Sequence, residues 1–268
     1  MLRPTYSPDW PDLWKRALVF DEHELWGSRE NLGYSYHYQN RREPVLNAVE
    51  ALARKGGTVL DVAAANGNFS LPLAEKGFRV TWNDIRPELA TWVQQKYEYG
   101  EIEYVGGNVF DFVDTWRGRF DAVVATEVIE HVAHPDQFLA TLAEVTAPGG
   151  VIVITTPNGK YFRNHLPKFS EYPDPSVFES VQFGPDSGDH IFLLHREELE
   201  DMGRKAGLKV ERYELHTNPL TAGHVKLGYL LPVLPKSLVW SLEKWSRRLP
   251  AAVADKIFTG SMTIYRKP

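Results

Sequence analysis

The stretch "TVLDVAAANGNFS" (58–70) has the pattern of a buried strand, a loop of small residues and the start of a helix. Asp61 lies near the strand end, and Ala63, Ala65 and Gly67 alternate through the loop. Such a unit is where open α/β proteins bind a nucleotide. A dinucleotide loop would be richer in glycine, so the two alanines favour a ligand without a diphosphate. The alternative is a tight turn that binds nothing.

Outward from this stretch, short apolar runs alternate with amphipathic segments from about residue 45 to 214. This alternation predicts a doubly wound α/β fold with a mostly parallel sheet. The predicted strands cover 58–63, 78–84, 102–108, 120–126, 150–158 and 208–215, and "FTGSMTIYRKP" (258–268) predicts one more that closes an edge. The predicted helices cover 69–77, 86–99, 135–150 and 196–207.

Three segments lie outside this alternation, at 1–45, 157–194 and 217–255. Long connections of this kind are uncommon unless they serve function, so we expect them to build a pocket and its lid. The predicted domain organisation is an N-terminal cap (1–45), a nucleotide-binding core (46–216), a helical insertion that caps the substrate (217–255) and a closing strand (256–268).

Polar residues follow the next two predicted strands. Asp84 ends the second strand about 20 residues after the loop, where an acid can accept hydrogen bonds from ribose hydroxyls. Taken singly, Asp84 can equally cap the helix predicted over 86–99. Asn108 ends the third strand, where its amide can bind the edge of an adenine.

A second stretch, "TEVIEHVAHPDQF" (126–138), spaces Glu127, Glu130 and His131 by three and four residues. We predict that it is helical or enters a helix, which would place the three side chains on one face. Such a stripe can hold a divalent metal, act as acid or base, or be a solvated helix start.

Composition narrows the class of protein. The chain has 268 residues, 43% of them hydrophobic, no cysteine and a formal charge of −5. The charge gives no electrostatic basis for binding long nucleic acid. No apolar run reaches the roughly 20 residues that span a membrane, and the start lacks the apolar core of a signal peptide. We therefore expect a cytoplasmic protein without disulfides or a transmembrane segment.

Over about residues 45 to 215 the chain resembles the class I S-adenosylmethionine (SAM)-dependent methyltransferases. "VLDVAAANGNFS" is similar to the first motif of that family, "VTWNDIRPEL" to the second and "VGGNVFDF" to the third. "FDAVVATEVIEHVAHPDQFLATLAEVTAPGGVIVITTPN" resembles the fourth and fifth, and it is the most specific match. The resemblance implies a Rossmann-like sheet of seven strands with the last one antiparallel.

The resemblance also implies a set of residues that bind SAM. Asp61 and the loop would cradle the methionine part, Asp84 would bind the ribose, and Asn108 with Val109 would face the adenine. The full set implied is Asp61, Ala63, Ala65, Gly67, Asp84, Ile85, Asn108, Val109 and Thr126.

Within the family, "EVIEH" is similar to a stretch in the O-methyltransferases of ubiquinone biosynthesis and in the enzymes that methylate the 2′-hydroxyl at the 3′ end of small RNAs. Some members of both bind a divalent cation there. The implied ligands are Glu127, Glu130, His131 and a downstream histidine, His190. His195 is the alternative ligand to His190, although its position is more typical of a residue that begins a helix. Carboxylates favour Mg²⁺ or Mn²⁺, and two imidazoles draw the preference toward Zn²⁺ or Fe²⁺.

The leading hypothesis is methyl transfer from SAM to a hydroxyl of a small molecule or glycan, with Glu130 and His131 as the catalytic residues and a divalent metal assisting. One alternative is an RNA 2′-O-methyltransferase, and another is a metal-independent enzyme in which His131 is the general base. An NAD-dependent oxidoreductase and a noncatalytic SAM-binding module are hypotheses from other classes. The glycine-poor loop disfavours the oxidoreductase, and the cluster of acids and histidines disfavours the noncatalytic module.

Two apolar regions allow further interpretations. The aromatic residues Trp26, Tyr34, Tyr36 and Tyr38 can stack on a sugar or flat ring, or pack a cap. The segment 225–240 can contact a lipid tail, or bury itself against the core.

Overall fold

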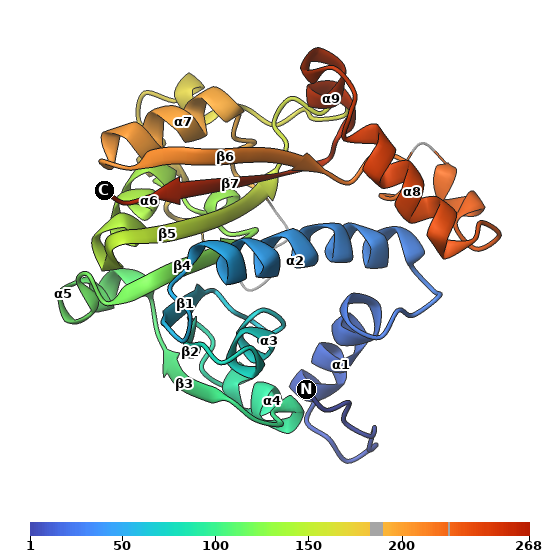
Figure 1. Cartoon of the computed structure of the whole chain (residues 1–268), viewed down its shortest axis with the longest axis horizontal. Coiled ribbons are helices and arrows are strands. Elements are labelled where there is room, and N and C mark those ends of the chain that lie inside the picture. Colours follow the sequence, from blue (N-terminus) through green and yellow to red (C-terminus); the bar gives the residue numbers. More distant parts are fainter. Residues whose placement is uncertain (183–189, 225) are drawn as a thin grey trace.

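The centre of the molecule is a seven-stranded sheet with the strand order β3-β2-β1-β4-β5-β7-β6 (Figure 1). The computed structural model describes residues 1–182, 190–224 and 226–268. Strands β1 to β5 pair in parallel, and β7 pairs antiparallel with both β5 and β6. The predicted doubly wound, mostly parallel fold is therefore confirmed, including the antiparallel last strand. The strands are β1 (Thr58–Val62), β2 (Arg79–Asp84), β3 (Glu101–Gly106), β4 (Phe120–Thr126), β5 (Thr146–Pro157), β6 (Lys209–His216) and β7 (Gly260–Arg266).

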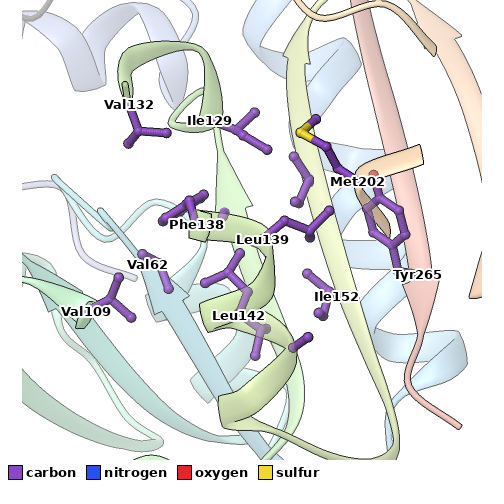
Figure 2. Close-up of a cluster of buried hydrophobic side chains, with 14 of the residues drawn as sticks. Val62, Val109, Ile129, Val132, Phe138, Leu139, Leu142, Ile152, Met202 and Tyr265 are labelled. Atoms are coloured by element: carbon purple, nitrogen blue, oxygen red, sulfur yellow. The ribbon is translucent and has the colours of Figure 1, made fainter. Parts of the chain in front are cut away.

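Helices cover both faces of this sheet. Those that follow the strands are α3 (Ser70–Glu75), α4 (Leu89–Lys96), α5 (Val113–Trp116), α6 (Pro135–Val145) and α7 (Arg196–Lys205). On one face, Leu139 and Leu142 of α6 and Met202 of α7 pack against Ile152 of β5 (Figure 2). On the other face, α2 (Leu32–Leu52) and α3 pack against the opposite side chains of the same strands. Burial on both faces explains why the central strands read as continuous apolar runs.

One predicted boundary is wrong. The sequence predicts a helix over 135–150, but α6 ends at Val145 and β5 begins at Thr146. Pro148 has no backbone N–H to donate within a helix and restricts the residue before it to extended backbone. The chain therefore leaves the helix early, and Thr146 pairs with Phe120 of β4.

The N-terminal segment consists of α1 (Asp12–Glu24) and the long helix α2. Helix α2 crosses the sheet and contacts β5 and β7 (Figure 1). It continues through residue 45, so the N-terminal segment and the core share one helix.

Two helices, α8 (Lys236–Ser246) and α9 (Ala251–Ile257), lie in the connection from β6 to β7. Figure 1 shows α8 beyond the end of β6. Within the described residues, no helix has the length and apolar character to cross a bilayer.

Candidate active site

The carboxyl edge of the sheet gathers the residues predicted to bind the methyl donor. Because β1, β2 and β4 are parallel neighbours, their last residues lie along one edge. Asp61 is next to last in β1, Asp84 is last in β2 and Thr126 is last in β4. Open α/β sheets bind ligands outside these strand ends.

The loop after β1 has an unusual backbone. Ala63 (φ 52°), Ala65 (φ 44°) and Gly67 (φ 70°) are all left-handed. For a residue with a Cβ this conformation costs roughly 1–2 kcal/mol. At Gly67 there is also no room for a side chain, because a Cβ would lie 2.6 Å from Cγ1 of Val93. The loop therefore follows a path suited to glycine, with alanine at two of its three left-handed positions.

Asp84 braces this loop. It is buried, and its Oδ2 accepts a hydrogen bond from the backbone N of Ala65 at 2.9 Å. Its Oδ1 accepts from the backbone N of Arg86 at 2.9 Å and from the Arg86 Nε at 3.0 Å. Ile85, between them, is exposed. A ligand hydroxyl that approaches Asp84 would compete with the Arg86 side chain.

Asp61 lies below the loop. It is buried, and its Oδ2 accepts a hydrogen bond from the Ser70 hydroxyl at 2.5 Å. Burial raises the pKa of the Asp61 carboxyl to about 7, and the charge of Asp84 acts in the same direction. The hydrogen bonds from Ser70 oppose this rise.

A buried network fixes α1 to the loop and to α4. Asp21 accepts hydrogen bonds from Asn66 (3.0 Å) and Asn68 (2.7 Å) through Oδ1, and from Trp92 Nε1 (2.8 Å) through Oδ2. The Lys96 ammonium, fully buried, donates to Asp21 Oδ2 at 2.7 Å and to Asn68 Oδ1 at 2.6 Å. Sequence reasoning missed this set because its members are far apart along the chain and none of them belongs to a recognisable motif.

At the end of β3, Asn108 caps a short 3₁₀ turn, with its Oδ1 accepting from the backbone N of Phe110 at 3.2 Å. Both residues line a pocket of about 220 Å³, whose other lining residues are Val132, His134, Gln137 and Gln182. The Val109 side chain is buried in the core with Val62 (Figure 2). Only the backbone of Val109 is therefore placed to face a ligand.

Glu130, His131 and His190 come together beyond the end of β4. One ligand atom from each lies within 4.8 Å of the others. Glu130 Oε1 is 4.0 Å from His131 Nε2, and the two imidazole centroids are 4.9 Å apart. The backbone N of Ile191 donates to the carbonyl O of Glu130 at 2.8 Å, which holds His190 beside the turn.

The Glu130 carboxyl is fully buried and only half hydrogen-bonded. Its Oε2 accepts from the Thr156 hydroxyl at 2.9 Å. Among the residues that the structure describes, none donates a hydrogen bond to Oε1. Burial raises the pKa of Glu130 well above its usual range, and the neighbouring Glu127 raises it further. A buried carboxylate oxygen without a donor is the kind of atom that a cation would satisfy.

Glu127 lies outside this group. Its Oε1 accepts from the Thr155 hydroxyl at 2.8 Å, and its Oε2 is 3.1 Å from an Arg41 guanidinium nitrogen. Although burial opposes its ionisation, Arg41 and His37 hold the pKa of Glu127 below its ordinary value.

The predicted helical stripe is therefore wrong in its geometry. Glu127 has a left-handed backbone (φ 53°), and only Ile129–His131 form a short 3₁₀ turn. Spacing by three and four residues does not align side chains across such a break. Glu130 and His131 instead meet His190 through tertiary folding.

His195, the alternative histidine, is the N-cap of α7 and lies outside the group of three. Its backbone N donates to Glu198 Oε2 at 2.8 Å. The interpretation of His195 as a helix start is confirmed.

A second polar cluster, which sequence reasoning missed, lies where α2 passes the start of β7. The His37 and His216 rings are 6.1 Å apart, and burial lowers the pKa of His37 to about 4. Within the described part of the chain, both polar side-chain atoms of Asn40 and the Nε2 of His216 are buried without a hydrogen-bond partner. Nearby in the sequence, His224 Nδ1 is 2.8 Å from the hydroxyl of Tyr161.

The N-terminal aromatics pack a cap. Tyr36 contacts Trp240 edge-to-face at 5.5 Å, and Tyr38 contacts Phe69 at 6.0 Å. Tyr34 donates to Glu24 Oε1 at 2.5 Å. These contacts join α2 to α8 and to the end of the loop after β1 (63–68), called the donor loop from here on.

Comparison with known proteins gives a consistent result. The family described as Methyltransferase domain matches residues 34–213. A ubiquinone biosynthesis O-methyltransferase of Caulobacter sp. (strain K31) is 37% identical over 106 residues, which is 39% of this chain and 42% of that protein. One of Nitrosococcus oceani is 29% identical over 171 residues, which is 62% and 70% of the two chains. The alignment thus spans less than half of the Caulobacter protein.

Among solved structures, the magnesium protoporphyrin IX methyltransferase of Synechocystis PCC 6803, with bound S-adenosylhomocysteine (SAH), superposes with a TM-score of 0.56. The match covers 96% of this chain and 94% of that one, at 14% identity. At that identity the likeness concerns the fold alone.

Proposed function

This chain belongs to the methyltransferase domain family, and from that premise we propose that it is a class I, SAM-dependent O-methyltransferase acting on a hydroxyl of a small molecule or glycan. The order of the seven strands and the placement of Asp61, Asp84 and Asn108 at successive strand ends support SAM as the donor. The names of the relatives, which are O-methyltransferases, support oxygen as the methylated atom.

The observation that carries the proposal is the convergence of Glu130, His131 and His190 at the edge that also holds the donor loop. A packing role alone would leave no reason to bury Glu130 Oε1 without a hydrogen-bond donor. In the proposal this cluster faces the acceptor hydroxyl. Glu127 lies beside the cluster, and its ion pair with Arg41 holds it there.

The proposed donor site uses the loop after β1, Asp84 and the pocket at Asn108. The left-handed loop from Ala63 to Gly67 faces the methionine part, and Asp84 binds the ribose once the Arg86 side chain moves away from it. The pocket at Asn108 and Phe110 takes the adenine. Asn108 meets the adenine edge with its amide, while Thr126 and the exposed Ile85 flank the nucleoside.

The donor set fits a divalent cation held by Glu130, His131 and His190. When bound, such an ion lowers the pKa of a hydroxyl that it coordinates and fixes its oxygen in place. One carboxylate with two imidazoles suits Mn²⁺, Fe²⁺ or Zn²⁺ better than Mg²⁺, which prefers oxygen ligands. The four ligands implied by the sequence included Glu127, and two carboxylates would have favoured Mg²⁺ or Mn²⁺. Without Glu127 the preference shifts toward the ions that imidazole binds well.

Methyl transfer forms a C–O bond to the acceptor, breaks the sulfonium C–S bond and releases the hydroxyl proton. Glu130, fully buried, and His131, half-buried beside it, would be engaged as ligands when a cation is bound, so the coordinated hydroxyl, with its pKa lowered, would release that proton to solvent. If no metal binds, His131 serves as the general base alone.

We further propose that residues 1–45 and 217–255 form the acceptor cap over the core of 46–216, which the strand at 256–268 completes. Helix α8 packs on α2 through Trp240 and Tyr36, so the two parts of the cap touch each other. The polar cluster of His37, Asn40 and His216 then supplies hydrogen bonds to the acceptor.

The test is a methyl-transfer assay with labelled SAM and a panel of catechols, sugars with vicinal diols and an RNA 3′ end. We expect activity on a small hydroxylated acceptor, lost after chelation and restored by Mn²⁺ or Zn²⁺. Activity that survives chelation but not His131→Ala would assign the reaction to a metal-independent base. Activity on the RNA end alone would contradict the small-molecule assignment.

A further inference from the structure

The segment 226–250, called the basic cap here, differs in charge from the rest of the molecule. The whole chain carries −5, whereas this segment has five basic residues and one acidic residue. The acidic residue, Glu243, is buried and pairs with Arg247 at 3.3 Å, which leaves four basic residues of the segment without an acidic partner inside it. The basic residues are Lys226, Lys236, Lys244, Arg247 and Arg248.

The basic cap also exposes an apolar stripe. In α8, Leu238 (43% exposed), Leu242 (36%) and Trp245 (61%) stand at i, i+4 and i+7, which places them on one face. Just before the helix, Tyr229 is 82% and Val233 74% exposed. Apolar groups that gather in this way mark an interaction surface rather than scattered exposure.

The stripe is not a face that should pack into the core, because the opposite face of α8 already packs against the rest of the molecule. Val239 is buried against Tyr36. Glu243 accepts hydrogen bonds from the backbone N of Thr217 at 2.9 Å and of Asn218 at 3.0 Å. Helix α8 therefore presents Leu238, Leu242 and Trp245 outward as part of its folded arrangement.

We propose that the basic cap docks on an anionic membrane surface, with α8 lying in the interface. Interfacial helices combine an apolar face with Lys and Arg around it, and Trp and Tyr favour the headgroup level. Each Lys or Arg near an anionic leaflet strengthens attachment by about 1 kcal/mol, or about fivefold in affinity. A two-fold contact between copies of the chain would instead place two basic caps face to face, where their like charges repel.

Docking in this way would also orient the enzyme. The basic cap follows β6, which ends at His216 in the polar cluster next to the candidate active site. Figure 1 places α8 at the end of the sheet where β6 ends. The carboxyl edge would thus lie close to the bilayer surface.

The test is flotation of the full-length protein with vesicles of phosphatidylcholine alone and of phosphatidylcholine mixed with phosphatidylglycerol. We expect binding to the anionic vesicles to be at least about tenfold tighter than to the neutral ones, and to weaken with salt. The variant L238S/L242S/W245S should lose binding by tenfold or more. The variant K244E/R248E, which keeps the apolar stripe, should lose anionic selectivity.

The matched control is V19S/F20S, which removes two equally exposed apolar residues from α1, where acidic residues outnumber basic ones. It should bind vesicles like the parent protein. Absence of binding, or equal binding to both vesicle types, would overturn the proposal. So would concentration-dependent dimerisation that the α8 variant abolishes without any vesicle binding, which would assign the stripe to a second copy. Because the readout is vesicle binding and not methyl transfer, failure here leaves the methyltransferase proposal unaffected.

Discussion

Two polar regions share the carboxyl edge of the sheet and differ in how completely their hydrogen bonds are made. On the donor side, around the loop 63–68, Asp21, Asp61 and Asp84 all have hydrogen-bond donors from the chain itself. On the acceptor side, Glu130 Oε1 and His216 Nε2 are as deeply buried but have no partner among the described residues.

The difference indicates what each side is built to do. A saturated buried network holds a shape, and here it holds a loop whose alanines would otherwise leave their left-handed conformation. An unpartnered buried polar atom costs about 1–3 kcal/mol and is explained most simply by a ligand that completes it. The donor side is thus preformed except for the Arg86 side chain, which must leave Asp84 for the ribose, and the acceptor side is completed by what binds to it.

The largest expected effect on stability lies in the donor side, at Lys96. Replacing it as Lys96→Met should lower the free energy of unfolding by about 3–5 kcal/mol, because Asp21 would remain buried without its counter-ion. Urea denaturation measures this. Removing both charges, as Lys96→Met with Asp21→Asn, should recover part of the loss. The control Arg204→Met, which breaks an exposed pair with Asp201, should cost less than about 1 kcal/mol.

On the acceptor side, Glu130→Gln should leave folding intact and impair catalysis. We expect methyl transfer to fall about 100- to 1000-fold, or about 3–4 kcal/mol of transition-state stabilisation, because the neutral amide is a much weaker ligand for a cation than a carboxylate. Steady-state kinetics with labelled SAM measures this. The exposed Glu144→Gln is the matched control and should retain full activity. Equal activity in both variants would remove Glu130 from the site.

On the donor side, the free energy of unfolding should depend on pH through the Asp61 carboxyl. The pKa of Asp61 is raised to about 7, so the folded state favours its protonated form. That stabilising contribution is fully present below the unfolded value near 3.8 and is lost as pH rises through about 7. Between pH 5 and 8 the parent should therefore lose about 2–3 kcal/mol relative to Asp61→Asn. Thermal unfolding across this range measures the difference, and parallel pH curves for the two proteins would contradict the assignment.

The smallest effect concerns the loop backbone. Ala65→Gly should stabilise the protein by about 0.5–1 kcal/mol, since relief of the left-handed strain exceeds the entropy that glycine adds to the unfolded chain. Ala65→Val should destabilise it. Chemical denaturation compares the two, and a destabilising glycine would show that the left-handed geometry carries no strain.

The sequence predicts the donor side better than the acceptor side, for a physical reason. Asp61, Asp84 and Asn108 follow strands whose apolar pattern is local, so their place at one edge follows from the parallel sheet alone. The group of Glu130, His131 and His190 joins a turn to a residue some 60 positions away. Resemblance to a family indicated that group, whereas the helical periodicity used for it was wrong at Glu127.

The contacts of α1 and α2 could not be predicted at all. Asp21 meets Lys96 across 75 positions, and Arg41 reaches Glu127 from another element. Neither pair has a sequence signature, because any buried acid and base are compatible with many partners until the helices are placed.

The most direct test of this contrast is calorimetric titration of SAH into the chelated protein, followed by titration of Mn²⁺ and Zn²⁺ into the parent, Glu130→Gln and His190→Ala. We predict that SAH binds without metal and with similar affinity in all three proteins. A separate metal isotherm should appear in the parent and be lost in both variants. A metal isotherm that persists in Glu130→Gln, or SAH binding that requires the metal, would contradict a preformed donor side beside an acceptor side that a cation completes.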